Sequence, residues 1–407
     1  MIPLIFLPTI FSGCLPSLRV LTLATTVIWP IGLFRGLVSF ECGGSDLFVV
    51  SPVNVFEVLL ESPSIEFLRL VGGCVLPPGS EPPLIPLPSL RECTMVGEGT
   101  TSLIRFIIIP TTALVSLRKP YNDGWTAFPE FNRYSLTPGL CVLGEVSIVS
   151  FSISDHAVRL QAMNDHGGVL EAEVDKLDDL STDPLAFLSF VQRSFECWRT
   201  CPGLETTKEL TLSIERGGIW GPQESTDCAI DLVRFIANLP GIEGIKLHGI
   251  PPTEVFLIFK YLSCSQRLKL ACPNLKRLDI ESSPLRSPRS LLEELGKLLT
   301  EREEAGVPVQ SVAVKVRCEM LIPATDHCAF LASWEGLAGD VSLEYEQTEV
   351  KSCLGIAPAP ARRKLRIERA KKGTKRGTKK RTNRRLILVV AWDGMVGREN
   401  GRRQRQP

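Results

Sequence analysis

The chain has 407 residues, of which 44% are hydrophobic and 22% are charged, a balance that excludes a wholly disordered protein and allows a continuous buried core. Its net charge of +1 hides two oppositely charged parts, because 19 of the 46 Lys/Arg but only three of the 45 Asp/Glu lie after residue 350. The first 350 residues therefore carry about −15 and the rest about +16, which predicts an acidic folded body joined to a basic tail.

Cysteine usage and the lack of sorting signals predict an intracellular protein. The 13 cysteines are scattered and no Asn-x-Ser/Thr sequence occurs, which favours a reducing compartment with free, mostly buried thiols. The apolar start, residues 1–11, has no charged leading segment, so we interpret it as the end of an earlier repeat rather than a signal peptide. The most apolar run, residues 20–34, is interrupted by Pro30 and does not resemble a membrane helix. We expect a cytoplasmic or nuclear location and no membrane partner.

A proline followed by apolar residues at plus two, plus five and plus seven recurs along the chain. In the first part of the chain the frame follows Pro16 and Pro63, and in a weaker form Pro88. It returns after Pro240 and Pro273. The last two apolar positions alternate inward as in a strand and the first lies beneath it, which is the strand pattern of a leucine-rich repeat.

The segments around the first three strands predict further elements within residues 1–120. A helix is expected over residues 53–61, with Phe56, Leu59 and Leu60 on its buried face. The proline-rich residues 80–88 indicate a loop, and residues 113–117 a further strand.

The middle of the chain, residues 121–200, follows no regular frame. Residues 140–153 alternate apolar and small side chains and predict one or two strands, whereas the acidic residues 171–179 are expected to be exposed. Asp183 and Pro184 are typical of a helix start. The apolar face of that helix comprises Leu188, Val191, Phe195 and Trp198.

Strands and helices alternate through residues 201–350. The prolines at 202, 240, 273 and 308 are 38, 33 and 35 residues apart, which leaves room for a helix in each repeat. Helices are expected over residues 227–238, 252–262, 288–306 and 324–334, and strands at 210–212, 242–247, 275–280, 309–314 and 341–343.

One feature of the common repeat pattern is missing. The position three residues after the last apolar one is often Asn or Cys, whose side chain binds the backbone of the turn. Here that position holds Thr26, Gly73, Glu98, Ile250 and Ser283. The turns must therefore satisfy their backbone groups in another way, and we expect an irregular array.

These patterns predict an α/β fold, an irregular leucine-rich-repeat solenoid of the strand–helix horseshoe type. It would comprise N-terminal repeats (1–120), irregular middle repeats and a helix (121–200) and C-terminal repeats (201–350). Stacked repeats expose a long array of strand side chains, which makes the inner strand face the candidate surface for protein partners. The charged residues expected on it are Arg69, Glu92, Lys246, Lys276, Arg277 and Asp279. Charged strand residues of this kind often only face solvent, and that alternative stays open.

Residues 351–407 form the predicted disordered basic tail. Residues 362–385 contain almost only Lys, Arg, Thr and Gly and cannot form a core, and a short apolar segment, residues 386–392, follows. The basic run fits a nuclear import signal or a phosphate-binding segment, and because no aromatic residue is interleaved, contact with nucleic acid would be non-specific and salt-sensitive. A solvated tail without a partner is the alternative. The residues concerned are Lys371, Lys372, Lys375, Arg376, Lys379, Lys380, Arg381, Arg384 and Arg385.

Signals for catalysis are weak. Of the four histidines, His156 and His166 each follow an aspartate, but no second pair has the spacing of metal ligands, so polar loop residues are the preferred interpretation. Cys197 and Cys201 likewise lack a second ligand pair. No nucleophile elbow, phosphate loop or dinucleotide fingerprint occurs. We therefore predict no enzyme, no cofactor, no metal and no small-molecule substrate.

The repeat phrases resemble those of a known family. SPSIEFLRL (residues 62–70), LPSLREC (87–93) and CPNLKRL (272–278) look like the repeats of the F-box/leucine-rich-repeat proteins abundant in basidiomycete fungi. The resemblance covers roughly residues 10–345 and rests on pattern and phrase style. No F-box precedes these repeats, so we expect a truncated product or a repeat-only relative.

The resemblance implies a function in ubiquitin transfer. In that family an F-box docks onto the Skp adaptor of a cullin ubiquitin ligase and the repeats hold the substrate, so the chain would be a non-catalytic, substrate-recognising subunit. Residues 250–262 (IPPTEVFLIFKYL) mimic the opening of an F-box, although their place between two repeat strands favours a repeat helix. The alternative function is that of a nuclear protein associating with nucleic acid or chromatin through the basic tail.

Overall fold

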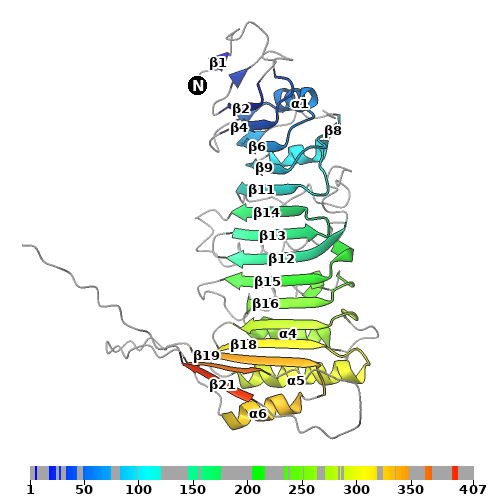
Figure 1. Ribbon diagram of the computed structural model, residues 1–407, viewed down its shortest axis with the longest axis vertical. Helices are drawn as coiled ribbons and strands as arrows, with labels where there is room; N and C mark the ends of the chain where they lie inside the picture. Colours follow the sequence, from blue (N-terminus) through cyan, green and yellow to red (C-terminus); the bar gives the residue numbers. More distant parts are fainter. Residues whose placement is uncertain are drawn as a thin grey trace, which may run out of the picture.

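The proline-anchored frames form strands of one large sheet. In the computed structural model fifteen strands stack side by side along the long axis of the molecule (Figure 1). In spatial order they are β2 (Val20–Leu23), β4 (Ser39–Cys42), β6 (Phe67–Val71), β9 (Glu92–Val96), β11 (Leu114–Pro120), β14 (Val169–Asp175), β13 (Ala157–Asn164), β12 (Val146–Ser154), β15 (Glu209–Glu215), β16 (Gly244–Ile250), β17 (Arg277–Ser282), β18 (Ser311–Cys318), β19 (Asp340–Gln347), β20 (Arg363–Glu368) and β21 (Ile387–Trp392).

The structure describes most of the chain before residue 348 and two strands after it. The described residues are 5–6, 18–23, 27–28, 34–43, 49–74, 83–97, 99–120, 145–154, 157–175, 204–215, 233–236, 239–250, 252–263, 271–282, 285, 288–318, 324–334, 336–347, 363–368 and 387–392.

The neighbouring strands of the sheet pair in parallel except around β13 and β20. Three small two-stranded sheets accompany it: β1 (Ile5–Phe6) with β3 (Val27–Ile28), β5 (Val49–Val50) with β7 (Gly73–Cys74), and β8 (Ile85–Pro86) with β10 (Ile107–Ile108). The fold is thus mixed α/β, with a large and mostly parallel sheet.

Burial follows the predicted frame closely. After Pro63, the apolar residues Ile65, Leu68 and Leu70 are all buried. The equivalent residues of later frames are buried as well: Leu90, Cys93 and Met95; Ile242, Ile245 and Leu247; Leu275, Leu278 and Ile280; Val309, Val312 and Val314. Each set places two side chains on one face of a strand and a third beneath it, so the predicted strands are confirmed.

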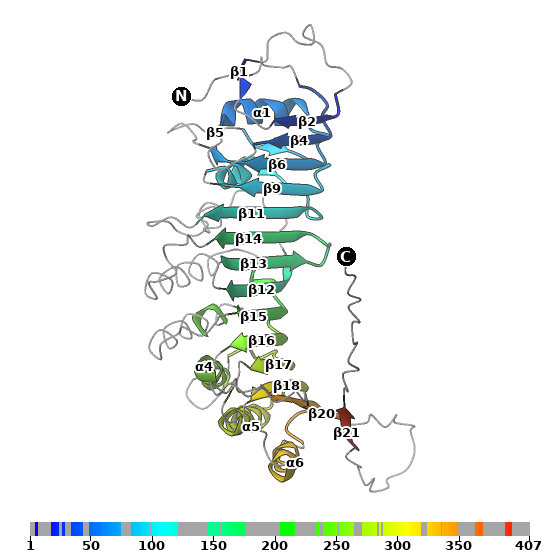
Figure 2. The same cartoon turned by 90° about the vertical axis from the view of Figure 1, so that its left-hand side faces the viewer.

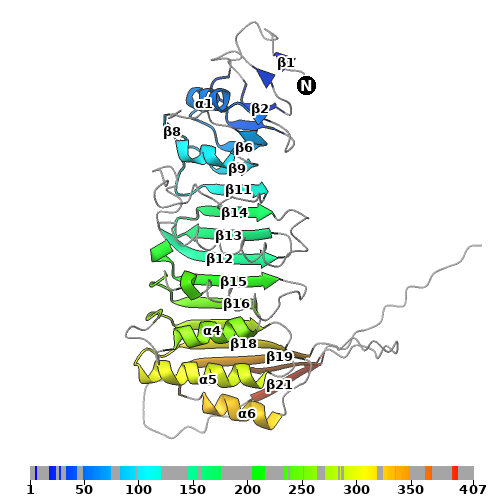
Figure 3. The ribbon, with the colours of Figure 1, turned by 180° about the vertical axis from the view of Figure 1, so that it is seen from behind.

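The described helices cover only one face of the sheet. They include α1 (Pro52–Glu61), α4 (Pro252–Leu262), α5 (Arg289–Glu304) and α6 (Ala324–Ser333), with 3₁₀ turns η1 (Thr101–Phe106) and η5 (Leu204–Thr206). Helices α1, α4, α5 and α6 lie on the same side of the strands, as the side and rear views show (Figures 2 and 3). Among the described helices, none combines the length and the hydropathy needed to cross a bilayer.

Glycines close the turns after the first strands, where the Asn or Cys of the common pattern is missing. Gly43, Gly72 and Gly97 have φ values of 109°, 128° and 111°, and the N–H of Gly72 donates to the carbonyl of Val96 at 2.8 Å. A Cβ on Gly97 would lie 2.4 Å from the carbonyl oxygen of Gly72. Only glycine fits this close approach. Direct backbone hydrogen bonds take the place of the side-chain ladder that this chain lacks.

The middle of the chain is where the predictions were least accurate. Strands β12, β13 and β14 form an antiparallel meander inserted between β11 and β15, so that β14 lies beside β11 and β12 beside β15. Strand β12 was predicted, but β13 and β14 were missed. Residues 171–175, expected to be simply exposed, belong to β14, where partly buried acids alternate with buried Ala172 and Val174.

Other expectations were confirmed or corrected in detail. Helices α1, α4, α5 and α6 match their predicted ranges to within a few residues, but the prediction for Leu60 was wrong: it is 51% exposed, and Val55 and Val58 are buried with Phe56 and Leu59 instead. Residues 233–236 are helical as predicted, and the remainder of 227–238 lies outside the described residues, as does the predicted helix after Asp183.

The tail prediction of disorder differs from the structure at two places. Strands β20 and β21 lie in this segment and pair antiparallel with β19 and with each other. Strand β21 coincides with the apolar segment noted in the sequence. The basic residues from Lys371 to Arg385 lie outside the described part of the chain.

Candidate functional site on the open sheet face

The candidate site is the sheet face turned away from the helices, here called the open face. Alternate side chains of each strand point toward the helices and are buried, and the others point to the open face. Since the register is maintained from strand to strand, the open-face side chains line up in rows across the sheet. The first row runs through Phe67, Glu92, Leu114, Val169, Met163, Ile148, Glu209, Gly244, Arg277, Ser311 and Asp340.

Two further rows lie beside the first. The second row runs through Arg69, Thr94, Ser116, Glu171, Gln161, Ser150, Thr211, Lys246, Asp279, Ala313 and Ser342. The third runs through Val96, Arg118, Glu173, Arg159, Ser152, Ser213, His248, Glu281, Lys315 and Glu344. Together the three rows extend from β6 to β19, and most of their side chains are polar.

The predicted partner-binding residues fall into two separate groups on this face. Arg69 and Glu92 lie on β6 and β9, whereas Lys246, Arg277 and Asp279 lie on β16 and β17. The strands β11, β14, β13, β12 and β15 separate the two groups.

The sixth predicted residue, Lys276, lies just before β17 and outside the rows. Its Nζ contacts Glu243 at 2.9 Å.

Most charges on the open face are balanced by a nearby strand. Arg69 pairs with Glu41 on the adjacent strand at 3.2 Å, and Arg277 on β17 pairs with Glu209 on β15 across Gly244 of β16. Such exposed pairs contribute little to stability, because water and salt screen them. They do give each part of the face a fixed charge pattern, and charge patterns of this kind set selectivity in protein interfaces generally.

Two ion-pair clusters were missed in the sequence because their members are far apart in the chain. Where β11 meets the meander, Arg118 contacts Asp175 at 2.6 Å and Arg159 contacts Glu173 at 2.6 Å. These side chains come together only through the order β11–β14–β13, which no local pattern encodes.

The second cluster spans β16, β17 and β18. Glu281 accepts hydrogen bonds from Lys315 at 2.7 Å and from Arg317 at 2.6 Å, and His248 lies 3.5 Å away. The hydrogen bond from Lys315, followed by the charges of Lys315 and Arg317, holds the pKa of the Glu281 carboxyl below its ordinary value despite partial burial. Glu281 is therefore ionised at neutral pH and ties three strands together.

Four consecutive residues of the first row are apolar and form a stripe across β11 and the meander. It consists of Leu114, Val169, Met163 and Ile148 on four adjacent strands. Leu114 is 39% exposed and Ile148 36%, and Val169 and Met163 are half-buried. Sequence reasoning missed this stripe, because an apolar strand residue is normally assigned to the core.

The two residues of the Asp165-His166 pair face different partners in the structure. Asp165 contacts Lys208 at 3.6 Å and His166 contacts Glu145 at 3.6 Å, so the two side chains have different exposed partners. A hydrogen bond from Ser147 and the charge of Lys208 lower the pKa of Asp165. Among the described residues, no group of three or more His, Cys, Asp or Glu is placed to hold a metal ion. His156, Cys197 and Cys201 lie outside them.

The described cysteines are mostly buried and free, as predicted. Burial raises the pKa of Cys42 and Cys93 to about 12 and that of Cys74 and Cys272 to about 11. Since the thiolate is the nucleophilic form, these thiols are inert at neutral pH.

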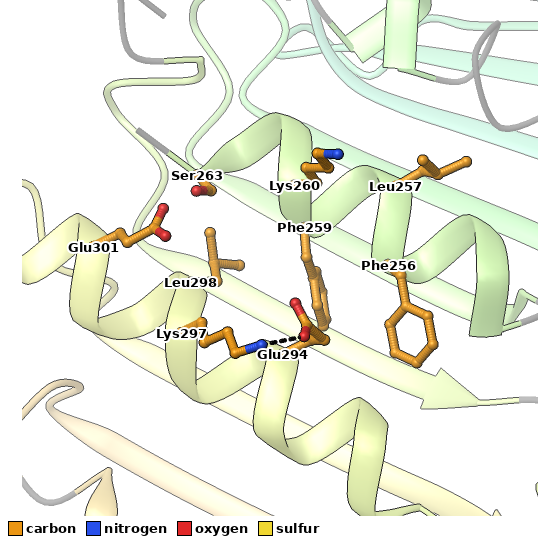
Figure 4. Close-up of a pocket in the computed structure, with 9 residues that line it drawn as sticks. All are labelled: Phe256, Leu257, Phe259, Lys260, Ser263, Glu294, Lys297, Leu298 and Glu301. Carbon is orange, nitrogen blue, oxygen red and sulfur yellow. Dashed lines mark hydrogen bonds and ion pairs between the residues drawn. The ribbon is translucent and has the colours of Figure 1, made fainter. Parts of the chain in front are cut away.

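A groove of about 350 Å³ lies on the other side of the sheet, between α4 and α5 (Figure 4). Phe259 and Leu298 form its buried floor, and Lys297 pairs with Glu294 at 2.5 Å at its rim. The residues that line it include no histidine or cysteine, and they point to no particular catalytic reaction.

Helix α4 is the F-box-like segment of the sequence. It connects the parallel strands β16 and β17, and its residues Val255, Ile258 and Leu262 are buried in the core. The preferred interpretation of this segment as a helix between two strands is confirmed. Comparison with protein-family models, with curated proteins and with solved structures finds no match for this chain.

Proposed function

We propose that the chain is a protein-recognition scaffold of the leucine-rich-repeat type, and that its open face binds the partner. The observation that carries the proposal is the one-sided covering of the sheet. The described helices lie on one face (Figure 2), and the strand register places continuous rows of side chains on the other. Fixed rows on a rigid sheet are a suitable frame for selective binding, since the partner meets side chains whose positions are already ordered.

Within this proposal, the repeat phrases support a role as the substrate-recognising region of an F-box/leucine-rich-repeat ubiquitin ligase subunit. Helix α4 would then be the candidate contact for the Skp adaptor. Because its most apolar residues are buried, adaptor binding there would have to use the groove residues Phe256 and Leu257, which remain half-buried.

The experiment is affinity purification of the tagged full-length chain followed by mass spectrometry, with a charge-swapped variant as its test. Lys246 and Asp279 lie opposite each other on β16 and β17, so the double variant Lys246→Asp, Asp279→Lys keeps their attraction and reverses the pattern offered to a partner. We expect this variant to lose partners that the native chain recovers. The matched control swaps the exposed pair Arg289 and Glu293 on α5.

The outcomes separate the two levels of the proposal. Partners lost with the open-face swap and kept with the α5 swap support the scaffold. Equal recovery from both variants contradicts it. Recovery of the Skp adaptor and a cullin supports the ligase assignment, and a stable set of other partners without them rejects that assignment alone.

The second candidate function rests on the charge separation between body and tail. About +16 in the last 57 residues would attract nucleic acid or chromatin without sequence preference. This function predicts that the protein leaves a nuclear pellet at high salt and that removal of the tail abolishes the association. Release at low salt, or retention of the tail-deleted chain, would reject it.

A further inference from the structure

We infer that the apolar stripe on the open face is a docking site for a basic amphipathic helix of a partner protein. This inference rests on the proposed scaffold function and names the class of segment that the scaffold would hold. It is independent of the F-box resemblance, because three of the four stripe residues belong to the meander, which interrupts the repeat frame.

The first step is the continuity of the stripe. Leu114, Val169, Met163 and Ile148 are direct register partners on β11, β14, β13 and β12, so their side chains are neighbours across the sheet. Elsewhere in the same row, the strands from β15 to β19 carry Glu209, Gly244, Arg277, Ser311 and Asp340. A contiguous exposed apolar patch within a polar surface marks an interaction site more often than single exposed apolar residues do.

The second step is the spacing, which selects the shape of the occupant. Adjacent strands lie about 4.8 Å apart, so the stripe offers an apolar side chain about every 4.8 Å along a line perpendicular to the strands. A helix laid along this line presents one residue per turn of about 5.4 Å, and a three-turn helix matches the four strands. An extended segment would present same-side residues about 6.8 Å apart and would lose register after two contacts.

The third step is the charge at the border of the stripe. Glu92 lies beside Leu114 at one end, and Glu209, which also pairs with Arg277, lies beside Ile148 at the other. In the second row, the residues next to the stripe are Ser116, Glu171, Gln161 and Ser150, of which only Glu171 is charged. A helix with lysines or arginines flanking its apolar face would therefore be favoured over an acidic one.

The probe is a fluorescent peptide of about 18 residues, long enough for the three turns required, with leucines at every third or fourth position on one helical face and lysines on its flanks. Two matched peptides accompany it: a scrambled isomer of the same composition, and a version with glutamates in place of lysines. Binding to the full-length chain is measured by fluorescence anisotropy. We expect the lysine peptide to bind at least about tenfold more tightly than either matched peptide.

The variants place that binding on the stripe. Ile148→Thr and Val169→Thr keep the branched Cβ that strands favour and remove apolar contact, and each is expected to weaken binding about tenfold. Val20→Thr is the matched control, since Val20 is 60% exposed in the same row on β2, far from the stripe. Glu92→Lys is expected to reduce the preference for the lysine peptide over the glutamate peptide. Thermal unfolding checks that each variant is folded.

Several results would overturn the inference. The first is that the lysine peptide does not bind when the protein is present at about 100-fold the peptide concentration. The second is equal binding of the peptide to the Ile148→Thr and Val20→Thr variants. The third is tighter binding of the glutamate peptide or the scrambled peptide than of the lysine peptide. Sedimentation velocity covers the remaining occupant: a dimer that Ile148→Thr dissociates would assign the stripe to a second copy of the chain and also overturn it. If the peptide fails while the Lys246/Asp279 swap still removes partners, the scaffold stands and only the helix-docking inference falls.

Discussion

Arg302 shows how a single buried charge can hold a loop and a helix end together. Its side chain is fully buried, and its guanidinium donates to the carbonyl oxygens of Leu262 at 3.1 Å, Ala271 at 3.1 Å and Cys272 at 2.9 Å. These carbonyls belong to the end of α4 and to the segment that leads into β17. Cys272 itself has a φ of 48°, so this segment adopts a conformation that needs support.

Replacing Arg302 with methionine keeps most of the side-chain volume and removes all three hydrogen bonds to these carbonyl oxygens. We expect a loss of about 3 kcal/mol in the free energy of unfolding, because buried carbonyls are left without partners. Urea unfolding measures this loss. Arg289→Met, on the same helix but exposed, is the control and should change stability by less than about 0.5 kcal/mol. A loss of similar size in both variants would contradict the assigned role of Arg302.

Gly97 is a second position where one side-chain atom decides the local structure. Its φ is 111°, and a Cβ added there would stand 2.4 Å from the Gly72 carbonyl oxygen, so Gly97→Ala should cost more than about 2 kcal/mol and lower the melting temperature. Gly306→Ala is the comparison, because Gly306 also has a positive φ (75°) but no described atom within 4 Å of the place its Cβ would take. If the two variants have the same melting temperature, the close packing of the turns after β6 and β9 is not what selects glycine.

At the scale of elements, Glu281 joins three parallel strands. Replacing it with glutamine should lower stability at pH 7 by about 1 kcal/mol, since the side chain is partly screened by water. The folded-state pKa of Glu281 lies below its ordinary value of 4.5, so its contribution is present above pH 4.5 and is lost as the pH falls through the folded pKa. The difference between native protein and Glu281→Gln should therefore shrink as the pH falls below 4.5.

Chemical denaturation of both proteins from about pH 7 to about pH 3 tests this dependence. Glu293→Gln provides the reference, because Glu293 forms an exposed pair with Arg289 on α5 and should leave stability unchanged. A pH-independent difference for Glu281→Gln would show that the residue acts through packing rather than through its charge.

The elements also show what could and could not be predicted from the sequence. The proline frame predicts strands well, because it combines a turn residue with a fixed inward alternation that most copies keep. Strand β14 was missed although Leu170, Ala172 and Val174 alternate inward, because Glu171, Glu173 and Asp175 dominate the composition of the segment. The pairing of β14 with β11 depends on a chain reversal, which no local period contains.

The same reasoning explains the partial prediction of the candidate site. Charged residues such as Arg69 and Lys246 are recognisable as outward-facing, because alternation within their own strands places them opposite buried neighbours. The apolar stripe is not recognisable in this way: Leu114 and Ile148 lie beside buried apolar residues, and their exposure follows from the order of strands in the sheet.

At the scale of the whole molecule, the three predicted segments of the body share one sheet. Hydrogen-bonded pairing crosses from β11 to β14 and from β12 to β15, and the buried apolar residues form one core from Leu23 to Tyr345. We expect hydrogen-exchange protection of β6, β13 and β17 to be lost at the same urea concentration, since the described buried residues form this single core. Earlier loss of protection in β6 would indicate that the N-terminal strands unfold independently.

The buried thiols make the stability of the whole molecule fall as the pH rises into the alkaline range. An unfolded thiol ionises near its ordinary pKa of 9.0, whereas burial raises the pKa of Cys42 and Cys93 to about 12 and that of Cys74 and Cys272 to about 11. Because these folded-state pKa values are raised, the neutral thiols contribute stability below pH 9 that is lost as the pH rises toward 12. The unfolded chain then binds fewer protons than the folded one, so the free energy of unfolding falls by up to about 1.4 kcal/mol per pH unit for each thiol.

Urea unfolding between about pH 8 and about pH 10.5 measures this slope against the background of other titrating groups. Cys93→Ala should be less stable at about pH 8, because it leaves a small cavity, yet lose stability less steeply above about pH 9, because one buried thiol no longer titrates. Cys328→Ala removes an exposed thiol that meets water in both states and should retain the native slope. Parallel slopes for the native protein and Cys93→Ala would mean that the core admits hydroxide or water to this thiol before it unfolds, and that the sheet and its helical layer open locally at high pH.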